Sequence, residues 1–241
     1  MLLDPETENE IVFQLCQLLG RAILPIRQVG PAGTPGTAFF WNELIGATDD
    51  GEVVHEYLLT ADVLTDAAFG EIGVRPSVTE PAGVASDEIV MPDFAEQWLH
   101  LPEVGVAAMP TGGLHGHAED RGWRWRTQQV TDGVAARADA VARVGAEPAS
   151  AFVLALGVAD DGSRPLEAVI ARVVRDGDDV RLTTELPAGY AGAPVFQVEV
   201  GADGDPVLRC LGLVLPGEGG HRIATFDRIR SAVAAATADW R

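Results

Sequence analysis

The stretch GYAGAPVF, residues 189–196, is the most informative in the chain. Gly189 and Gly192 suit a tight turn, because glycine adopts backbone conformations that β-branched residues avoid. The apolar run that follows predicts a buried strand directly after the turn. At the centre of the turn stands Ala191, which carries no hydroxyl or other reactive group.

Composition narrows the classes of protein that remain. The chain has 241 residues, enough for one large all-β domain or two small ones with a sizeable core. Its net charge of −19 comes from 36 acidic and 17 basic residues, and every basic residue is arginine. Because such a chain is repelled by phosphate backbones and anionic lipids, we expect neither nucleic acid nor membrane binding. The charge itself is interpreted as a source of solubility.

The cysteines and the N-terminus indicate a cytoplasmic protein. Cys16 lies in a predicted helix and Cys210 in a predicted buried strand, and one distant pair does not make a disulfide framework. The first residues lack a basic region followed by an apolar run, so no signal peptide is predicted. No stretch approaches the roughly 18 apolar residues of a membrane span. We therefore expect a cytoplasmic protein with free thiols.

Two series of short strands lie between two helices. A helix is predicted from Pro5 to Gly20 with Asp4 as its N-cap, and an amphipathic helix from about Phe226. Repeated apolar runs separated by Gly and Pro favour a sandwich or barrel. The first series is predicted at 23–29, 36–44, 52–60, 71–78 and 104–110. The second is predicted at 151–158, 165–184, 193–200 and 206–216, with 165–184 forming a hairpin that turns at 176–179.

Residues 111–150 interrupt this strand pattern. They are polar, rich in Gly and partly rich in Ala, which is typical of a linker, with a helical turn near 133–143. The expected organisation is an N-terminal helix over 1–20, a first β-barrel over 21–118, an inter-barrel linker over 119–150, and a second β-barrel with a C-terminal helix over 151–241.

Five stretches resemble the trypsin/chymotrypsin-like serine peptidases, in the family's order. GTAFFW (36–41) resembles the Gly-Thr-Gly-Phe strand of bacterial members, and YLLTADVL (57–64) the stretch with the catalytic His. LPEVGVAAMP (101–110) resembles the stretch with the catalytic Asp, and GYAGAPVF the turn with the catalytic Ser. CLGLVLPG (210–217) resembles the later strand whose backbone edge binds substrate. The resemblance covers about 22–238 and implies an all-β fold of two packed six-stranded antiparallel β-barrels.

The residues that carry the chemistry of that family are missing. The mechanism needs a serine hydroxyl, an imidazole and a carboxylate. Ala191 stands at the serine position and Gly105 at the aspartate position. The histidine position holds Val63 in an ungapped match, or Asp62 with a one-residue deletion. Tyr190 replaces the aspartate that serves zymogen activation in animal enzymes. The resemblance therefore implies a catalytically inactive, intracellular bacterial pseudopeptidase.

The backbone of the turn is the predicted binding feature. The N–H groups of Gly189 and Ala191 could converge as a nest that holds a carbonyl or a carboxylate without cleaving it. Alternatively, the turn persists only because the barrel requires it. The expected binding residues are Gly189, Tyr190, Ala191, Gly192, Gly212 and Leu213.

The function expected from the resemblance is a protein- or peptide-binding adaptor without cofactor or metal, in bacterial signalling or defence. One alternative is that the cleft serves a different, biosynthetic chemistry, with acid–base groups from Asp62, His100, His115 or His117. Another is a hydrolase with displaced catalytic residues. Cys210 is a poor nucleophile for the latter, because it lies in an apolar strand.

Other polar motifs have both a functional and a plain interpretation. His115 and His117, with Glu119 and Asp120 nearby, would make a metal site only if a loop brought them together, and a solvated loop is the preferred interpretation. RGWRWR (121–126) is either a partner-binding patch or an arm with its tryptophans packed inward. His55 is expected to be structural. His221 could lie by the substrate-binding edge but is not chosen as a site residue. DDG (49–51) and DGDD (176–179) lack calcium-loop spacing and are interpreted as turns.

Overall fold

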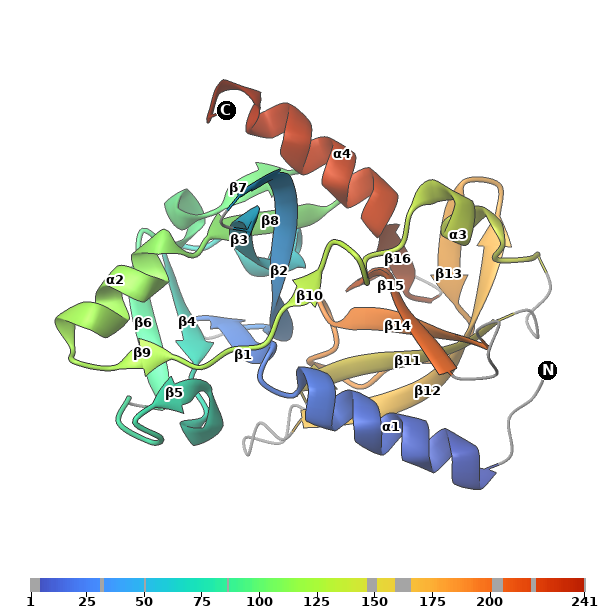
Figure 1. Cartoon of the computed structure of the whole chain (residues 1–241), viewed down its shortest axis with the longest axis horizontal. Coiled ribbons are helices and arrows are strands. Elements are labelled where there is room, and N and C mark those ends of the chain that lie inside the picture. Colours follow the sequence, from blue (N-terminus) through green and yellow to red (C-terminus); the bar gives the residue numbers. More distant parts are fainter. Residues whose placement is uncertain are drawn as a thin grey trace.

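The structure is a computed structural model of the chain, and it describes residues 5–30, 33–49, 51–85, 87–146, 151–158, 166–200, 206–217 and 220–240. Two β units lie side by side (Figure 1). Helix α1 (Pro5–Leu19) packs against the second unit, and helix α4 (Phe226–Ala236) contacts strands of both. Both helices lie where the sequence predicts them.

The first unit is a curved antiparallel sheet. Its strands are β1 (Ile23–Gln28), β2 (Pro35–Thr48), β3 (Gly51–Ala61), β4 (Phe69–Gly73), β6 (Glu88–Pro92), β7 (Leu99–Leu101) and β8 (Val106–Pro110). They are ordered β6-β4-β1-β2-β3-β8-β7, and β10 (Val130–Thr131) adds to β2 in parallel. Among the described strands, the end strands β6 and β7 do not pair with each other, so this unit is a half-barrel.

The second unit is a closed six-stranded barrel. Its strands are β11 (Ala151–Val158), β12 (Leu166–Asp176), β13 (Asp179–Leu182), β14 (Pro194–Val200), β15 (Pro206–Leu215) and β16 (Arg222–Thr225). They are ordered β11-β12-β13-β16-β15-β14, and β14 closes the barrel on β11. The prediction of an all-β fold with two packed barrels and terminal helices is confirmed, with the first barrel open at one side.

Short elements explain where the strand predictions fail. The predicted strand 71–78 ends at Gly73, because the chain turns into a 3-10 helix, η2 (Pro76–Val78), and proline cannot continue the ladder. Further 3-10 turns are η1 (Asp62–Leu64), η3 (Phe94–Gln97) and η4 (Ala238–Trp240). A two-residue pair joins β5 (Thr79–Glu80) to β9 (Arg124–Trp125). The sequence did not predict β6, β7 or β16.

The polar segment between the units is folded. It contains α2 (Gly112–Asp120) and α3 (Ala138–Ala142), the latter within the predicted helical turn. The expectation that His115 and His117 lie in a loop is wrong, because both belong to α2. After β10 crosses the first unit, Ala136 N–H donates to the Cys210 carbonyl oxygen at 2.8 Å. The segment therefore pairs with strands of both β units.

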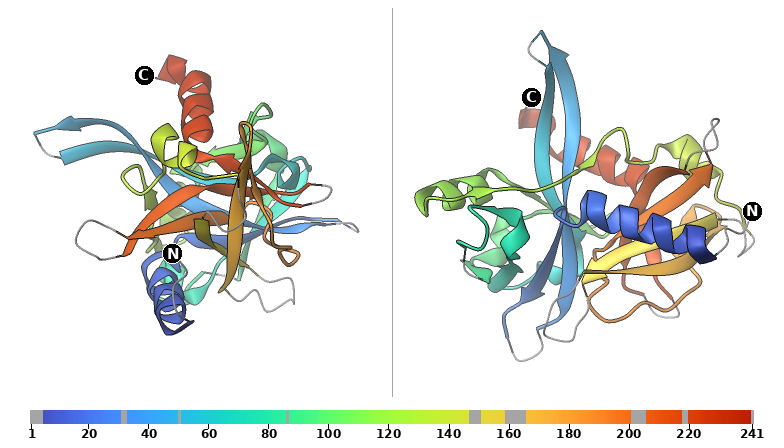
Figure 2. Two further views of the ribbon diagram at one scale, coloured as in Figure 1. Left: turned by 90° about the vertical axis from the view of Figure 1, so that its right-hand side faces the viewer. Right: turned by 60° about the horizontal axis from the view of Figure 1, so that its bottom comes forward.

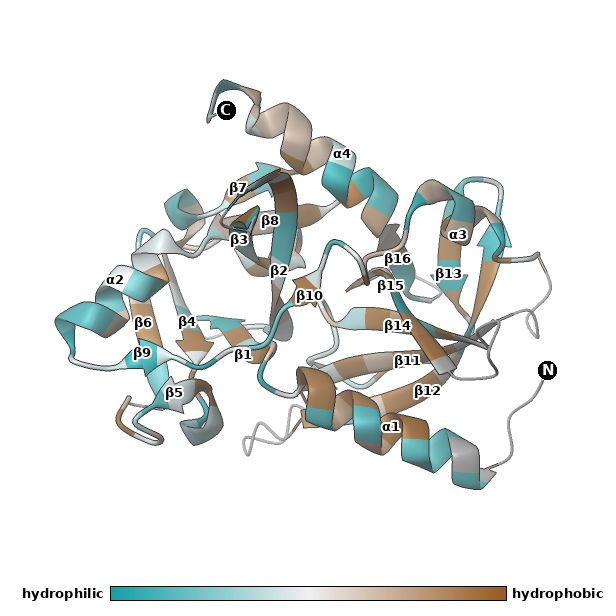
Figure 3. Ribbon diagram, in the orientation of Figure 1, coloured by the Kyte–Doolittle hydropathy of each residue, from teal (hydrophilic) through white to brown (hydrophobic). Residues whose placement is uncertain are grey.

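Aromatic side chains build the core where α4 meets the first unit. Phe226 packs against Phe39 and Trp41, with ring centroids 6.2 and 5.6 Å away, and Trp41 stacks on Tyr57. Helix α1 shows alternating apolar and polar stripes (Figure 3), and its apolar stripe buries Ile11 and Leu15. Among the described residues, no helix has both the length and the apolar character needed to cross a membrane.

Candidate functional site

The turn at 187–194 lies between the two units. Gly189 and Gly192 have φ values of 95° and 81°, a region that favours glycine. A Cβ on Gly192 would collide with the Thr37 carbonyl oxygen and the Thr60 hydroxyl. The glycines are therefore required by backbone conformation and by the close approach of the first unit.

Thr37, a fully buried residue of β2, holds this turn in place. Its N–H donates to the Ala191 carbonyl oxygen at 2.8 Å, and its hydroxyl donates to the Gly189 carbonyl oxygen at 2.7 Å. The same hydroxyl accepts from the Val158 N–H at 3.1 Å. The Thr60 hydroxyl donates to the Thr37 carbonyl oxygen at 2.8 Å. One side chain thus links β2, the turn and β11.

Two N–H groups of the turn are not used internally. The N–H groups of Tyr190, Gly192 and Ala193 donate to backbone carbonyls, at 3.3, 2.8 and 2.9 Å. Those of Gly189 and Ala191 have no acceptor among the residues that the structure describes. These are the two donors that the sequence suggested for a nest, and Ala191 is partly exposed. Their convergence on one ligand atom stays a prediction.

Other expected binding residues face inward. The Tyr190 side chain is fully buried in the second barrel, where a Cβ on Gly157 would come within 2.7 Å of its ring. Burial, with smaller contributions from Glu167 and Cys16, raises the pKa of the Tyr190 hydroxyl. Gly212 and Leu213 have strand partners in both β14 and β16. That Gly212 and Leu213 bind a ligand stays a prediction.

The positions that resemble the histidine and aspartate sites are adjacent. Asp62 N–H donates to the Gly105 carbonyl oxygen at 3.0 Å. Val63 is 59% exposed. Gly105 has φ of 70°, and a Cβ there would lie 3.3 Å from a Leu215 methyl group. A side chain at position 105 would therefore be strained by the positive φ and would crowd Leu215 slightly.

His100 on β7 is held by two acceptors. Its Nδ1 lies 2.5 Å from Asp62 Oδ1, and its Nε2 lies 2.9 Å from the Ala95 carbonyl oxygen. Because a carbonyl and a carboxylate both accept, both ring nitrogens are best satisfied when protonated. Burial alone would lower the pKa of His100, but the bonds to Asp62 and Ala95 outweigh it and the pKa is raised. No ring nitrogen is left to act as a base.

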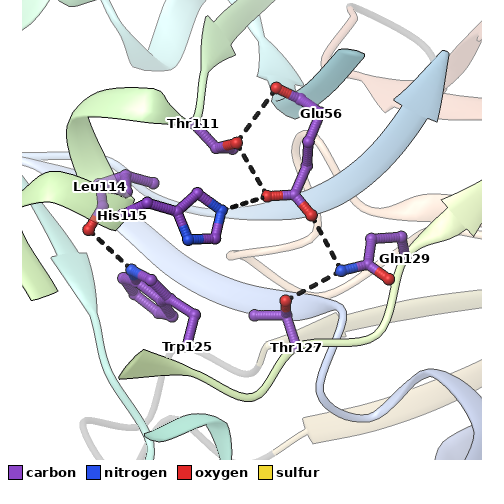
Figure 4. Close-up of polar contacts among 7 residues, drawn as sticks. All are labelled: Glu56, Thr111, Leu114, His115, Trp125, Thr127 and Gln129. Atoms are coloured by element: carbon purple, nitrogen blue, oxygen red, sulfur yellow. Dashed lines mark hydrogen bonds and ion pairs between the residues drawn. The ribbon is translucent and has the colours of Figure 1, made fainter. Parts of the chain in front are cut away.

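A second polar cluster surrounds Glu56 on β3 (Figure 4). Glu56 Oε1 accepts from the Thr111 hydroxyl and from His115 Nε2, both at 2.8 Å. Gln129 Nε2 donates to Glu56 Oε2 at 2.9 Å and approaches the Thr127 hydroxyl at 3.0 Å. His115 could be singled out from the sequence, but its partner Glu56 could not, because the two are 59 residues apart in the chain.

Two cavities flank His115. The first, which we call the Glu56 pocket, has a volume of about 500 Å³ and is lined by His55, Glu56, Thr111, His115 and Trp240 among others. The second has a volume of about 630 Å³ and lies beside the Glu80–Arg124 ion pair and Trp123. The His115 side chain is half exposed and borders both.

The contacts of the remaining candidate residues are those of packing and backbone pairing. The His117 ring packs on Trp123 at 6.4 Å, and the described residues contain no group of three potential metal ligands. Trp123 and Trp125 are buried, which agrees with the inward-packed interpretation of RGWRWR. The Leu182 N–H donates to the His221 carbonyl oxygen. Both cysteines are free, and burial raises the pKa of the Cys210 thiol.

Solved serine proteases share this fold. The crystal structure of the serine endoprotease from Yersinia pestis has a TM-score of 0.53 and 12% identity, over 95% of this chain and 68% of that one. The HtrA-type protease AlgW with tripeptide has a TM-score of 0.53 and 14% identity, over 94% of this chain and 63% of that one. This chain thus spans less than two thirds of the AlgW chain.

No protein-family model and no curated protein matches the sequence. Identities of 12% and 14% show the fold alone. The chain therefore has the fold of the trypsin-like serine proteases.

Proposed function

We propose that the protein is a catalytically inactive member of this fold that binds a protein or peptide partner. The observation that carries the proposal is the set of residues at the three triad positions. The serine position holds Ala191, the aspartate position Gly105, and the histidine position Val63 or Asp62. These residues do not provide the combination of nucleophile, base and orienting carboxylate that the mechanism needs. The positive φ of Gly105 also disfavours an aspartate at that position, where a Cβ would lie 3.3 Å from a Leu215 methyl group.

The shape of the turn supports binding without cleavage. Gly189 and Gly192 keep their left-handed conformations, and Thr37 fixes the turn from the other unit. The N–H groups of Gly189 and Ala191, which have no acceptor among the described residues, suit a carbonyl or carboxylate oxygen of a ligand. A peptide offers such oxygens, so a peptide segment is the proposed ligand of the cleft. An adaptor role in signalling or defence rests on analogy with the fold.

Two observations argue against displaced catalytic residues. Both ring nitrogens of His100 are engaged, so this imidazole, which contacts Asp62, is not a ready base. The Cys210 thiol is fully buried and its pKa is raised, which keeps it protonated and unreactive.

Reaction with a fluorophosphonate probe and a panel of fluorogenic peptides tests this proposal. We expect no labelling and no turnover under conditions in which an active trypsin-like protease, run in parallel, is labelled completely. Stoichiometric labelling of one residue, with turnover that disappears when that residue is replaced, would overturn the proposal.

A further inference from the structure

The Glu56 pocket lies away from the turn at 187–194. Strand β8 runs from Val106, next to Gly105, to Pro110, which borders the pocket. The four steps of extended strand from Val106 to Pro110 span about 13 Å. The pocket therefore occupies the opposite end of β8 from the degenerate triad positions and does not depend on the proposed function of the cleft.

An open strand edge runs alongside this pocket. Strand β8 pairs with β3 only between Tyr57 and Ala61, whereas β3 extends back to Gly51 with β2 on its other side. Among the described strands, none pairs with residues 52–56 of β3 on the β8 side. The hairpin formed by β2 and β3 projects beyond the rest of the sheet (Figure 2). The Glu56 carbonyl accepts from the Thr111 N–H at 3.2 Å, which fixes the direction in which the edge faces.

Backbone groups alternate along a strand, so Val54 directs its N–H and C=O to the same side as Glu56. The side chains of Val53 and Val54 are 42% and 39% exposed. An unpaired edge with exposed β-branched residues is a template on which an extended segment can add as a further strand.

Several side chains of the pocket have hydrogen-bond acceptor positions that no described residue fills. A carboxylate offers about four acceptor positions, and three donors reach Glu56. His115 Nε2 faces Glu56, and Nδ1 makes no hydrogen bond to any described residue. His55 Nδ1 is buried and has no partner in the described part of the chain. The Thr111 hydroxyl donates its hydrogen bond to Glu56, so it can only accept from a ligand. A ligand side chain must therefore supply donors.

The negative charge of the Glu56 pocket and the aromatic ring of Trp240 indicate which kind of hydrogen-bond donor a ligand would present. The lining of the pocket holds the carboxylate of Glu56 and no arginine, and the chain carries a net charge of −19. Trp240 is 54% exposed at the rim, where an indole face suits a flat cation. A guanidinium is planar, has five donors and stacks on aromatic rings. The N–H of Gly112, at the start of α2, suits a carbonyl of the same ligand.

We propose that the Glu56 pocket and the adjoining edge of β3 bind an extended polypeptide segment that presents an arginine. The segment pairs with β3 through its backbone near Val54. Its guanidinium enters the pocket, contacts Glu56 and His115, and stacks on Trp240.

Fluorescence polarisation on the full chain tests this proposal with a labelled hexapeptide of alternating Thr and Val that carries one central Arg. A matched peptide carries Gln at that position, and free arginine is the competitor without a strand. We expect the Arg peptide to bind about tenfold tighter than the Gln peptide, the size of one charge-assisted hydrogen bond. We expect free arginine to compete only at concentrations at least about tenfold higher than the Arg peptide itself. Equal affinities, no binding of either peptide, or equal competition by free arginine would overturn the proposal.

Two variants locate the binding. Glu56→Gln has nearly the same shape, so we expect it to weaken the Arg peptide about tenfold and leave the Gln peptide unchanged. Trp240→Ala removes an exposed ring and should also weaken the Arg peptide, without risk to the core. Glu103→Gln, at an exposed acid next to Gly105, is the matched control and should change nothing. If Glu56→Gln fails to fold, Trp240→Ala still decides the outcome.

The result is separable from that of the cleft. Labelling by a serine-directed probe would end the proposed pseudopeptidase function and leave the Arg selectivity of the Glu56 pocket unaffected. An Arg-selective binding that both Glu56→Gln and Trp240→Ala leave intact would place the arginine elsewhere and end this proposal alone.

Discussion

Thr37 is the residue through which the first unit contacts the turn of the second. Its hydroxyl serves Gly189 and Val158 at once, in a fully buried position. Replacement by valine keeps the volume and the β-branch but leaves a buried carbonyl and a buried N–H without that partner. We expect Thr37→Val to lower the free energy of unfolding by about 1–3 kcal/mol in urea denaturation.

The control for this change is Thr48→Val. The Thr48 hydroxyl also donates to a backbone carbonyl, that of Gly51, but at an exposed hairpin end. Water replaces such a bond, so its loss should cost less than about 0.5 kcal/mol. An equal effect of both substitutions would show that Thr37 does not link the units in solution.

Ala191 tests whether the missing hydroxyl is the only defect. We expect Ala191→Ser to show no peptidase activity, because an unactivated serine is a weak nucleophile and triad members act as a unit. The measurement is turnover of fluorogenic peptides with an active protease as reference. Robust cleavage by the single variant would reveal a general base already in place.

Restoring all three groups meets a further obstacle. An aspartate at position 105 would have to adopt the positive φ of Gly105, and its Cβ would press on Leu215 at 3.3 Å. We therefore expect at most a trace of activity from Val63→His, Gly105→Asp and Ala191→Ser combined. Adding Leu215→Ala, which empties the space, should raise that trace in the same assay. Full activity without the change at Leu215 would contradict this packing argument.

At the scale of elements, the ion pair between Asp62 and His100 joins η1 to β7. Because the pKa of His100 is raised on folding, the contribution is fully present below the unfolded pKa of about 6.5 and is lost as the pH rises through the folded value. We expect the stability difference between the wild type and His100→Asn to be larger at pH 6 than at pH 9, by urea denaturation. A difference for His100→Asn that grows with pH would contradict the assignment.

The sequence predicted those helices and strands whose ends are marked by residues typical of a turn or a helix start. The hairpin predicted to turn at 176–179 has Asp176 paired with Asp179, and Pro5 begins α1. Helix α2 was missed because Gly112, Gly113 and Gly116 give it low intrinsic propensity. Its formation depends on tertiary contacts, since Leu114 and Ala118 are buried.

For the candidate sites too, the sequence could predict only what lies in one continuous stretch of the chain. The turn at 189–196 is a continuous stretch, so its glycines and missing hydroxyl could be recognised directly. Glu56 meets Thr111, His115 and Gln129 only because β3, α2 and the segment before β10 come together in the fold. No spacing in the sequence announces such a cluster. The contact of Leu215 with Gly105 likewise appears only when β15 lies against the first unit.

At the scale of the whole molecule, α4 joins the two units into one core. Phe226 is fully buried against Phe39 and Trp41. We expect Phe226→Ala to lower the free energy of unfolding by about 3–5 kcal/mol, as a buried aromatic ring is replaced by a cavity. Phe13→Ala, at a ring that is 64% exposed, is the control and should have a much smaller effect in the same denaturation experiment. Similar losses for both would show that α4 is not part of the core.

The position of α4 also bears on how the chain is made. A ribosome releases the N-terminal half first, and that half contains Phe39 and Trp41. The side chains that cover them, Phe226, Ile229 and Val233, lie on α4 and are synthesised much later than Phe39 and Trp41. A nascent chain halted before α4 therefore presents aromatic surface that the finished protein hides. Apolar surface exposed in this way favours aggregation until α4 packs onto it.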